Sequence, residues 1–290
     1  MEKPKYKLDF EIYACFDIKK DITIDMLDGS KIVLNKSKTI NKGSVFFEMD
    51  TLDQKKAEED GKFRVNYFLN CMLVALNIDN LVPPKFPKEP ELLNPEQFKD
   101  MPKTVYKDYS ISFDIVATLE EKRVMDASTF ANKLNSVDSE KQTIIRKCLF
   151  WLRKGAEATD DERFTYRWIS LEALLAIIQK NSTEKMLSIM LNNYLKNEKA
   201  KEIFEKNKQT IVELSEANLI GWKRAKYSEK LKETLKQQSD FKAIMTKATL
   251  CIFEVRNRLF HRGEIMPLIA GCNSLLRDLT REVLIGILGL

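Results

Sequence analysis

Helical periodicity is the strongest pattern in this chain, and it is clearest between residues 240 and 263. Apolar residues recur there at intervals of three and four, which predicts one helix of about six turns with a stripe that faces a core. The stripe consists of Ile244, Ala248, Cys251, Val255 and Leu259. Asp240 is suited to cap the start of this helix, and Gly263, followed by Pro267, is suited to end it.

The same periodicity predicts that the chain is helical from residue 121 to its end. Besides the helix above, we expect helices over residues 122–134, 139–155, 161–180 and 268–288, and two polar, lysine-rich helices between 183 and 236. The helix over 161–180 has a core stripe of Phe164, Trp168, Leu171, Leu175 and Ile178. Residues 159–162, with Thr159 first and Glu162 last, predict a capping box at its start.

Strand patterns occupy the first part of the chain. LDFEIYACF, KIVLN and SVFFEM predict strands, with a turn at Asp28-Gly29-Ser30, and a helix is expected over 55–76. Six of the eight prolines lie between 83 and 102, which predicts an extended, irregular segment without a helix. YSISFDIVATLE predicts one more strand. The fold class is therefore α+β: a mixed α/β domain over 1–120, including the Pro-rich segment 83–102, and an all-α domain over 121–290.

Composition narrows the class of protein. An apolar content of 44% and a charged content of 31% are typical of a globular protein. No apolar run is long enough to span a bilayer, and the charged N-terminus lacks the apolar core of a signal peptide, so we expect no membrane association. The five cysteines are scattered, which indicates reduced thiols and a cytoplasmic location. With one histidine and no cysteine pair, we expect neither a zinc site nor another cofactor.

Positive charge is concentrated in one segment. Residues 183–247 carry 14 Lys and Arg against 9 Asp and Glu, an excess equal to the net charge of +5 of the whole chain. Such a face can bind a phosphate backbone or can simply be the solvated side of helices, and both interpretations stay open. The candidate RNA-binding residues are Lys223, Arg224, Lys226, Lys230 and Lys232, together with Arg262 farther along the chain.

Arg256, Asn257 and His261 give the predicted helix over 240–263 its candidate chemistry. His261 is the only histidine of the chain, and histidine is the residue type that exchanges protons near neutral pH. Near the C-terminal end of a helix the imidazolium form is favoured, so His261 suits donation of a proton to a leaving oxygen. Arg256 suits the negative charge on a phosphate undergoing attack. One chain has no second histidine for the base step, so that step needs a second copy of the protein or water. The alternative to this catalytic interpretation is that His261 has a purely structural role.

Three features together resemble the HEPN superfamily, and within it Apea-like HEPN domains. They are a bundle of about four main helices, the segment RWISLEAL and the segment VRNRLFHRG, whose Arg256 and His261 fit an R-x4-6-H signature; the resemblance covers roughly residues 138–290. It implies a metal-independent endoribonuclease, a toxin or antiphage-defence effector with an inhibitory partner or antitoxin. Arg256 and His261 would be catalytic and Asn257 supporting, and Glu172 would match a commonly acidic position on the partner helix.

Other interpretations are a non-catalytic RNA- or nucleotide-binding HEPN module and a protein-interaction scaffold. A helical projection also places Phe253, Phe260 and Asn257 opposite the core stripe of the helix over 240–263, with Arg256 and His261 on either side. This second face is either covered by another helix of the bundle or meets its own copy in a two-fold homodimer. The dimer would bring two Arg256/His261 sets together, in agreement with the composite sites that the resemblance implies.

Overall fold

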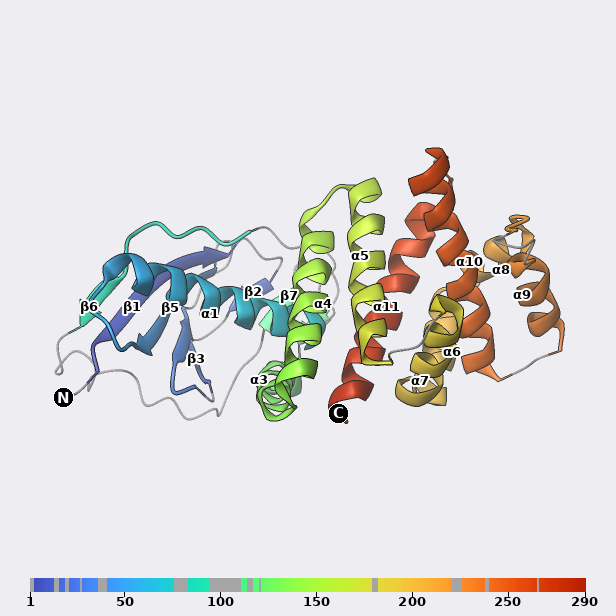
Figure 1. Ribbon diagram of the computed structural model, residues 1–290. Coiled ribbons are helices and arrows are strands. Elements are labelled where there is room, and N and C mark those ends of the chain that lie inside the picture. Colours follow the sequence, from blue (N-terminus) through green and yellow to red (C-terminus); the bar gives the residue numbers. More distant parts are fainter. Residues whose placement is uncertain are drawn as a thin grey trace. The chain divides into compact units, whose positions relative to one another are not determined.

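All strands of the described chain lie before residue 120, and all described helices except the one over Gln54–Ala75 lie after it, which confirms the predicted α+β class. The computed structural model describes residues 3–12, 16–18, 21–26, 28–35, 41–75, 83–93, 111–113, 117–119, 121–178, 182–220, 226–237, 240–264 and 266–290. The chain forms two compact units, Met1–Ser136 and Val137–Leu290. Figure 1 shows the strands in the first unit and a set of long helices in the second.

An antiparallel five-stranded sheet is the centre of the first unit, with the strand order β3-β4-β5-β1-β6. Its strands are β1 (Lys5–Ile12), β3 (Ile22–Asp25), β4 (Lys31–Leu34), β5 (Asn41–Glu48) and β6 (Glu91–Leu93). Alternate side chains of β1 are buried, as period-two strands with one covered face require. The predicted turn joins β3 to β4: Gly29 has φ 79°, and Asp28 Oδ1 accepts a hydrogen bond from the Ser30 N–H at 3.0 Å.

Helix α1 (Gln54–Ala75) packs on this sheet, and a glycine permits the close approach. A β-carbon at Gly61 would lie 2.8 Å from the Leu8 side chain and 3.0 Å from the Phe47 ring. Gly61 lowers the helix propensity of the first turns, and in exchange it lets the helix backbone approach the apolar face of β1 and β5. The described Pro-rich residues, 83–93, contain no helix and add β6 to the sheet; the rest of that segment lies outside the described residues.

The run YSISFDIVATLE does not form the single strand that its alternation predicts. It contains β7 (Ile111–Phe113) and β8 (Ala117–Leu119), which pair antiparallel with each other, while β7 also pairs with β2 (Phe16–Ile18). The prediction was wrong because a period of two continues on both sides of a chain reversal. Helix α3 (Glu121–Ser136) packs on α1 in the first unit, whereas the sequence placed it with the second; Tyr67 Oη donates to Ala131 O at 3.2 Å.

The second unit is entirely helical in its described part. Its elements are α4 (Ser139–Glu157), α5 (Asp160–Leu174), the 3-10 turn η1 (Leu175–Ile177), α6 (Thr183–Tyr194), α7 (Asn197–Lys206), α8 (Lys208–Glu216), α9 (Tyr227–Lys236), α10 (Phe241–Arg262) and α11 (Ile269–Leu288). Helix α5 packs against both α4 and α11, and α6, α7, α8 and α9 all pack against α10 (Figure 1). None of the described helices combines the length and apolarity needed to cross a bilayer.

Two sequence predictions for this unit were wrong in detail. The lysine-rich stretch between 183 and 236 forms four short helices instead of two. Between α6 and α8 the breaks contain neither Gly nor Pro. Asn207 ends α7 by donating its side-chain amide to Ile203 O at 2.9 Å, and Asn218, three residues before Gly221, has a left-handed φ of 49°. Thr159 does cap α5, but without a bond to a backbone N–H, because its hydroxyl donates to the Glu162 carboxylate at 3.4 Å.

Helix α11 passes its neighbours with almost no space between backbones. A β-carbon at Gly286 would lie 1.9 Å from the carbonyl oxygen of Tyr194, the last residue of α6. A β-carbon at Gly271 would lie 2.4 Å from Thr210 Oγ1 on α8. These two glycines therefore fix how closely α11 approaches the shorter helices.

Gly286→Ala should destabilise the second unit strongly, because a backbone carbonyl cannot rotate away as a side chain can. We expect the free energy of unfolding to fall by about 3 kcal/mol. Gly289→Ala is the control: Gly289 has φ 67° but no neighbour near its β-position, so we expect a loss of about 1 kcal/mol. Urea unfolding followed by tryptophan fluorescence measures both, since all three tryptophans lie in this unit. Equal losses would contradict the close contact.

Candidate functional site

Helix α10, which carries the Arg-Asn-His motif, passes from core to solvent at the motif itself. Four of the five predicted stripe residues are buried, and the fifth, Leu259, is only partly buried. Residues 256–259 are intermediate in exposure, and 260–264 are exposed. The helix ends as predicted at Gly263, whose φ of 66° is left-handed, with its N–H donating to Leu259 O at 3.0 Å. The C-terminal end of α10 extends beyond the other helices of the unit (Figure 1).

Arg256 lies at this transition and has three different neighbours. Its Nη1 donates to Asn257 Oδ1 at 3.1 Å, and its Nη2 lies 3.9 Å from Glu172 Oε2 on α5, an ion pair too long to be a hydrogen bond. Its guanidinium carbon lies 4.9 Å from the centroid of the Phe260 ring. Its Nε is buried and has no hydrogen-bond partner. The structure thus brings Arg256, Asn257 and Glu172 together and leaves part of the guanidinium without an acceptor.

The two phenylalanines of the second face have different surroundings. Phe253 packs against Trp168 on α5, with ring centroids 5.6 Å apart, so the covering of this position by a helix of the same bundle is confirmed. Phe260 is 48% exposed. The indole N–H of the fully buried Trp168 has no hydrogen-bond partner. Of the second face, as far as the structure describes its surroundings, the part near Phe260 is therefore the part exposed to solvent.

His261 lies one residue beyond Phe260, in the last turn of α10, and is exposed. It lies five positions after Arg256, which corresponds to about 140° around the helix and about 7.5 Å along it. The two side chains therefore leave α10 in different directions. Arg262, also exposed, has Nη1 3.9 Å from Glu264 Oε1. Of the four residues predicted to be catalytic, His261 is the one that the described contacts do not tie to the others.

Arg258, which the sequence analysis did not single out, connects α10 to the turn before α9. Its Nε lies 3.4 Å from Glu254 Oε1, and its Nη2 donates to Asn218 O at 3.1 Å. Glu254 is almost fully buried, so this arginine also neutralises a carboxylate inside the bundle. Glu and Arg four residues apart on a helix were visible in the sequence as a signal for such a pair.

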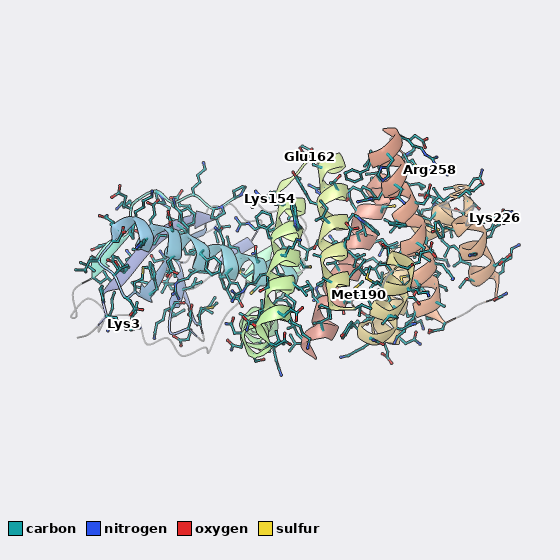
Figure 2. All side chains as sticks on the ribbon, viewed as in Figure 1. Lys3, Lys154, Glu162, Met190, Lys226 and Arg258 are labelled. Carbon is teal, nitrogen blue, oxygen red and sulfur yellow. The ribbon has the colours of Figure 1, made fainter. Side chains whose placement is uncertain are left out.

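The candidate RNA-binding lysines are exposed where the structure describes them. Lys226, Lys230 and Lys232 lie at or on α9, and Lys226 also pairs with Glu229 at 2.8 Å. Figure 2 shows Lys226 near α9 and Arg258 on α10, both in the second unit. Lys223 and Arg224 lie outside the described residues. The described part of this basic surface is therefore a lysine-rich face of α9 with acidic side chains interspersed.

The cysteines of the second unit are buried, free thiols. Burial raises the pKa of Cys148, Cys251 and Cys272 to about 12, so these thiols stay protonated at neutral pH. Tyr227 beside the bundle core also has a raised pKa, because burial and a hydrogen bond to Glu184 disfavour its phenolate. Among the described residues, no three His, Cys, Asp or Glu side chains lie together as a metal site would require.

Comparison with known proteins adds no further assignment: no protein-family model, curated protein or solved structure matches this chain. The residues at the end of α10 and their neighbours are therefore the basis for any functional assignment.

The two phenylalanines should respond differently to the same substitution. Phe253→Asp would place a carboxylate against the buried Trp168 ring, so we expect the free energy of unfolding to fall by about 3 kcal/mol. Phe260→Asp changes an exposed position and should alter the free energy of unfolding of the monomer by no more than about 0.5 kcal/mol. Urea unfolding of both variants checks this. A Phe253→Asp protein as stable as wild type would mean that Phe253 does not pack on α5.

Proposed function

We propose that this protein is a metal-independent endoribonuclease that cleaves RNA at a site formed by Arg256 and His261. The observation that carries the proposal is the state of Arg256: a permanent cation at the solvent boundary, with a buried Nε that lacks a partner and an Nη2 that only faces Glu172 at 3.9 Å. An arginine held in this way can exchange its loose contact with Glu172 for a bidentate contact with a phosphate. The nearby His261 supplies a group that transfers protons near neutral pH.

The proposed reaction is attack of the RNA 2′-OH on the adjacent phosphorus. The new bond joins the 2′-oxygen to phosphorus, and the bond from phosphorus to the 5′-oxygen breaks. The leaving 5′-oxygen takes a proton from His261 in its imidazolium form, and Arg256 stabilises the negative charge that gathers on the phosphorane. The 2′-OH proton goes to a base, which is water or the His261 of a second copy. The products carry a 2′,3′-cyclic phosphate and a 5′-OH.

Asn257 and Glu172 act through Arg256 in this proposal. Asn257 accepts from Nη1, and Glu172 provides the opposite charge on the other side of the guanidinium. Lys226, Lys230 and Lys232, with Arg262, would hold the RNA backbone electrostatically. The resemblance to HEPN ribonucleases agrees with this assignment. It also suggests a cytoplasmic toxin or antiphage-defence effector that is held inactive by an inhibitory partner or antitoxin.

One observation favours a second candidate, a non-catalytic RNA- or nucleotide-binding module. In the described structure His261 accepts and donates no hydrogen bond that would fix its ring, whereas a general acid benefits from such an orientation. Arg256 and the α9 lysines could bind phosphate without any proton transfer. Salt-dependent RNA binding without cleavage would support this second function, and a lack of any RNA binding would leave only the protein-interaction scaffold.

Cleavage of total cellular RNA by the purified protein should persist in excess EDTA and leave a 2′,3′-cyclic phosphate on the upstream fragment. Arg256→Ala and His261→Ala should each lower the cleavage rate by about 10²- to 10⁴-fold, the range typical of acid–base groups. Arg256→Lys should also lose most activity, because a point charge does not replace the planar guanidinium.

Circular dichroism of the same variants is the control for folding. Retained helical content with lost cleavage supports the assigned roles, and unfolding of both alanine variants would make the motif structural. Cleavage that EDTA abolishes and magnesium or manganese restores would disprove the mechanism.

The base step leads us to propose a homodimer formed through the exposed end of α10. Two-fold pairing around Phe260 would bring together two Arg256/His261 sets, so that one histidine serves as acid and the other as base. A partner at this end can also receive the two side chains that leave the helix about 140° apart.

We expect Phe260→Asp to yield inactive monomers with unchanged helical content. Phe253→Asp is unsuitable for this purpose because that ring packs inside its own bundle. Mixing Arg256→Ala with His261→Ala protein should restore part of the activity if one site draws on both copies. Sedimentation at the assay concentration provides the decisive measurement, since a fully active monomer would exclude a dimeric site.

A further inference from the structure

We infer that the outer face of α4 is a second RNA-contact surface, which stacks a base of single-stranded RNA on Phe150 and holds the neighbouring phosphates with Lys147 and Lys154. This inference rests on the proposed function, because it assumes an RNA substrate, but it involves none of the residues of the Arg256 site.

The surface begins with an aromatic ring that the fold does not bury. Phe150 is 48% exposed, although the adjacent Leu149 and Leu152 are buried in the bundle. Its ring meets Trp151 edge-on, with centroids 5.1 Å apart, and Trp151 stacks on Tyr166 of α5 at 5.5 Å. The Trp151–Tyr166 pair joins α4 to α5, but Phe150 is the outer ring of this row and keeps part of its surface in solvent.

Cations lie on both sides of the exposed ring along the same helix face. Lys147 and Lys154, three residues before and four residues after Phe150, are both exposed, and Lys154 Nζ lies 5.9 Å from the ring centroid. Figure 2 labels Lys154 on α4. The two lysines are separated by roughly 10 Å along the helix axis. A flat ring between two cations matches the alternation of bases and phosphates in a single strand.

The acidic groups close to this face are largely neutralised. Glu157 is nearly buried and pairs with Arg153 at 2.7 Å and with Lys154 at 3.5 Å. Over its whole length α4 has five Lys and Arg and two Asp and Glu, an excess of three positive charges. Glu162 on α5, one turn before Tyr166, is exposed and accepts a hydrogen bond from the Thr159 hydroxyl at 3.4 Å.

RNA fits this surface better than a protein partner does. A single exposed phenylalanine is a small apolar contact, and isolated ones are ordinary on protein surfaces. Stacking, in contrast, needs only one accessible ring, is tolerant of sequence, and gains from adjacent positive charge. The surface would hold RNA flanking the scissile bond rather than the reacting phosphate.

The test measures binding of the full-length protein to a fluorescent 12-nucleotide oligouridylate whose 2′-oxygens are all methylated, so that it cannot be cleaved by 2′-OH attack. Phe150→Leu keeps the apolar volume and removes the flat ring. We expect it to weaken binding by about fivefold or more, with the salt dependence unchanged. Lys147→Gln with Lys154→Gln should instead reduce the slope of log affinity against log salt by about two.

Phe63→Leu provides the matched control. Phe63 is also an exposed helix phenylalanine beside an aromatic ring, Tyr67 at 6.5 Å, but its neighbours one turn away are Glu59 and Asp60 instead of lysines. It should bind the oligonucleotide like wild type. A Phe150→Leu protein with wild-type affinity overturns the inference, and so does a loss shared by Phe63→Leu or explained by altered self-association in sedimentation.

Cleavage assays on unmodified RNA separate this inference from the proposed function. Phe150→Leu should raise KM and leave kcat within about twofold of wild type, since it removes binding without touching the reacting groups. If wild type cleaves RNA and Phe150→Leu has an unchanged KM, the α4 surface is disproved and the proposed ribonuclease function is not. If the wild-type protein neither cleaves nor binds RNA, both proposals are wrong.

Discussion

The burial of α10 controls where chemistry can occur in the second unit. This helix is enclosed by α6, α7, α8 and α9 along most of its length, and its apolar stripe is fully buried up to Val255. Polar groups inside such a packing need a partner, and Glu254 has one in Arg258. One residue beyond Val255 the surroundings change, because the last turns of the helix extend past its neighbours. Arg256, Asn257 and His261 can be polar and accessible only because they lie beyond that point.

Arg256 has several contacts at this position but, among the described residues, no close ion pair that would occupy its positive charge. Phe260 lies against the guanidinium of Arg256, Asn257 accepts a hydrogen bond from Nη1, and Glu172 lies at ion-pair distance from Nη2. An ion pair that is partly exposed and this long contributes little to stability, so its loss to a phosphate costs little. Glu172, at 40% side-chain exposure, can turn toward water when the arginine turns toward RNA. The arrangement is therefore consistent with the phosphate-binding role proposed for Arg256.

Sequence periodicity was sufficient for the long helices and failed where short elements meet without glycine or proline. α10 and α5 could be predicted because their apolar residues are spaced for one buried stripe, and Gly263 supplied the left-handed end. The break at Asn207 has neither Gly nor Pro beside it and depends on a side-chain bond, and the break after α8 is marked only by Asn218 and Gly221, which are weaker signals than a proline. The Glu172–Arg256 contact joins residues 84 positions apart, and no spacing rule predicts it. Its acidic member was found through resemblance alone.

The exposure of His261 in the last turn of α10 agrees with the role proposed for it. A histidine that acts on a bound phosphate needs room on its own side of the helix, and its ring has to be oriented by something. Among the described residues no neighbouring side chain provides that orientation, and in the proposed mechanism the RNA or a second copy of the protein would provide it. Both would approach the same end of α10, where Phe260 and Arg262 are also exposed. The features that make the site incomplete in one chain, an accessible ring, a loosely held arginine and a single histidine, are therefore concentrated on one small surface, where one binding event could complete them together.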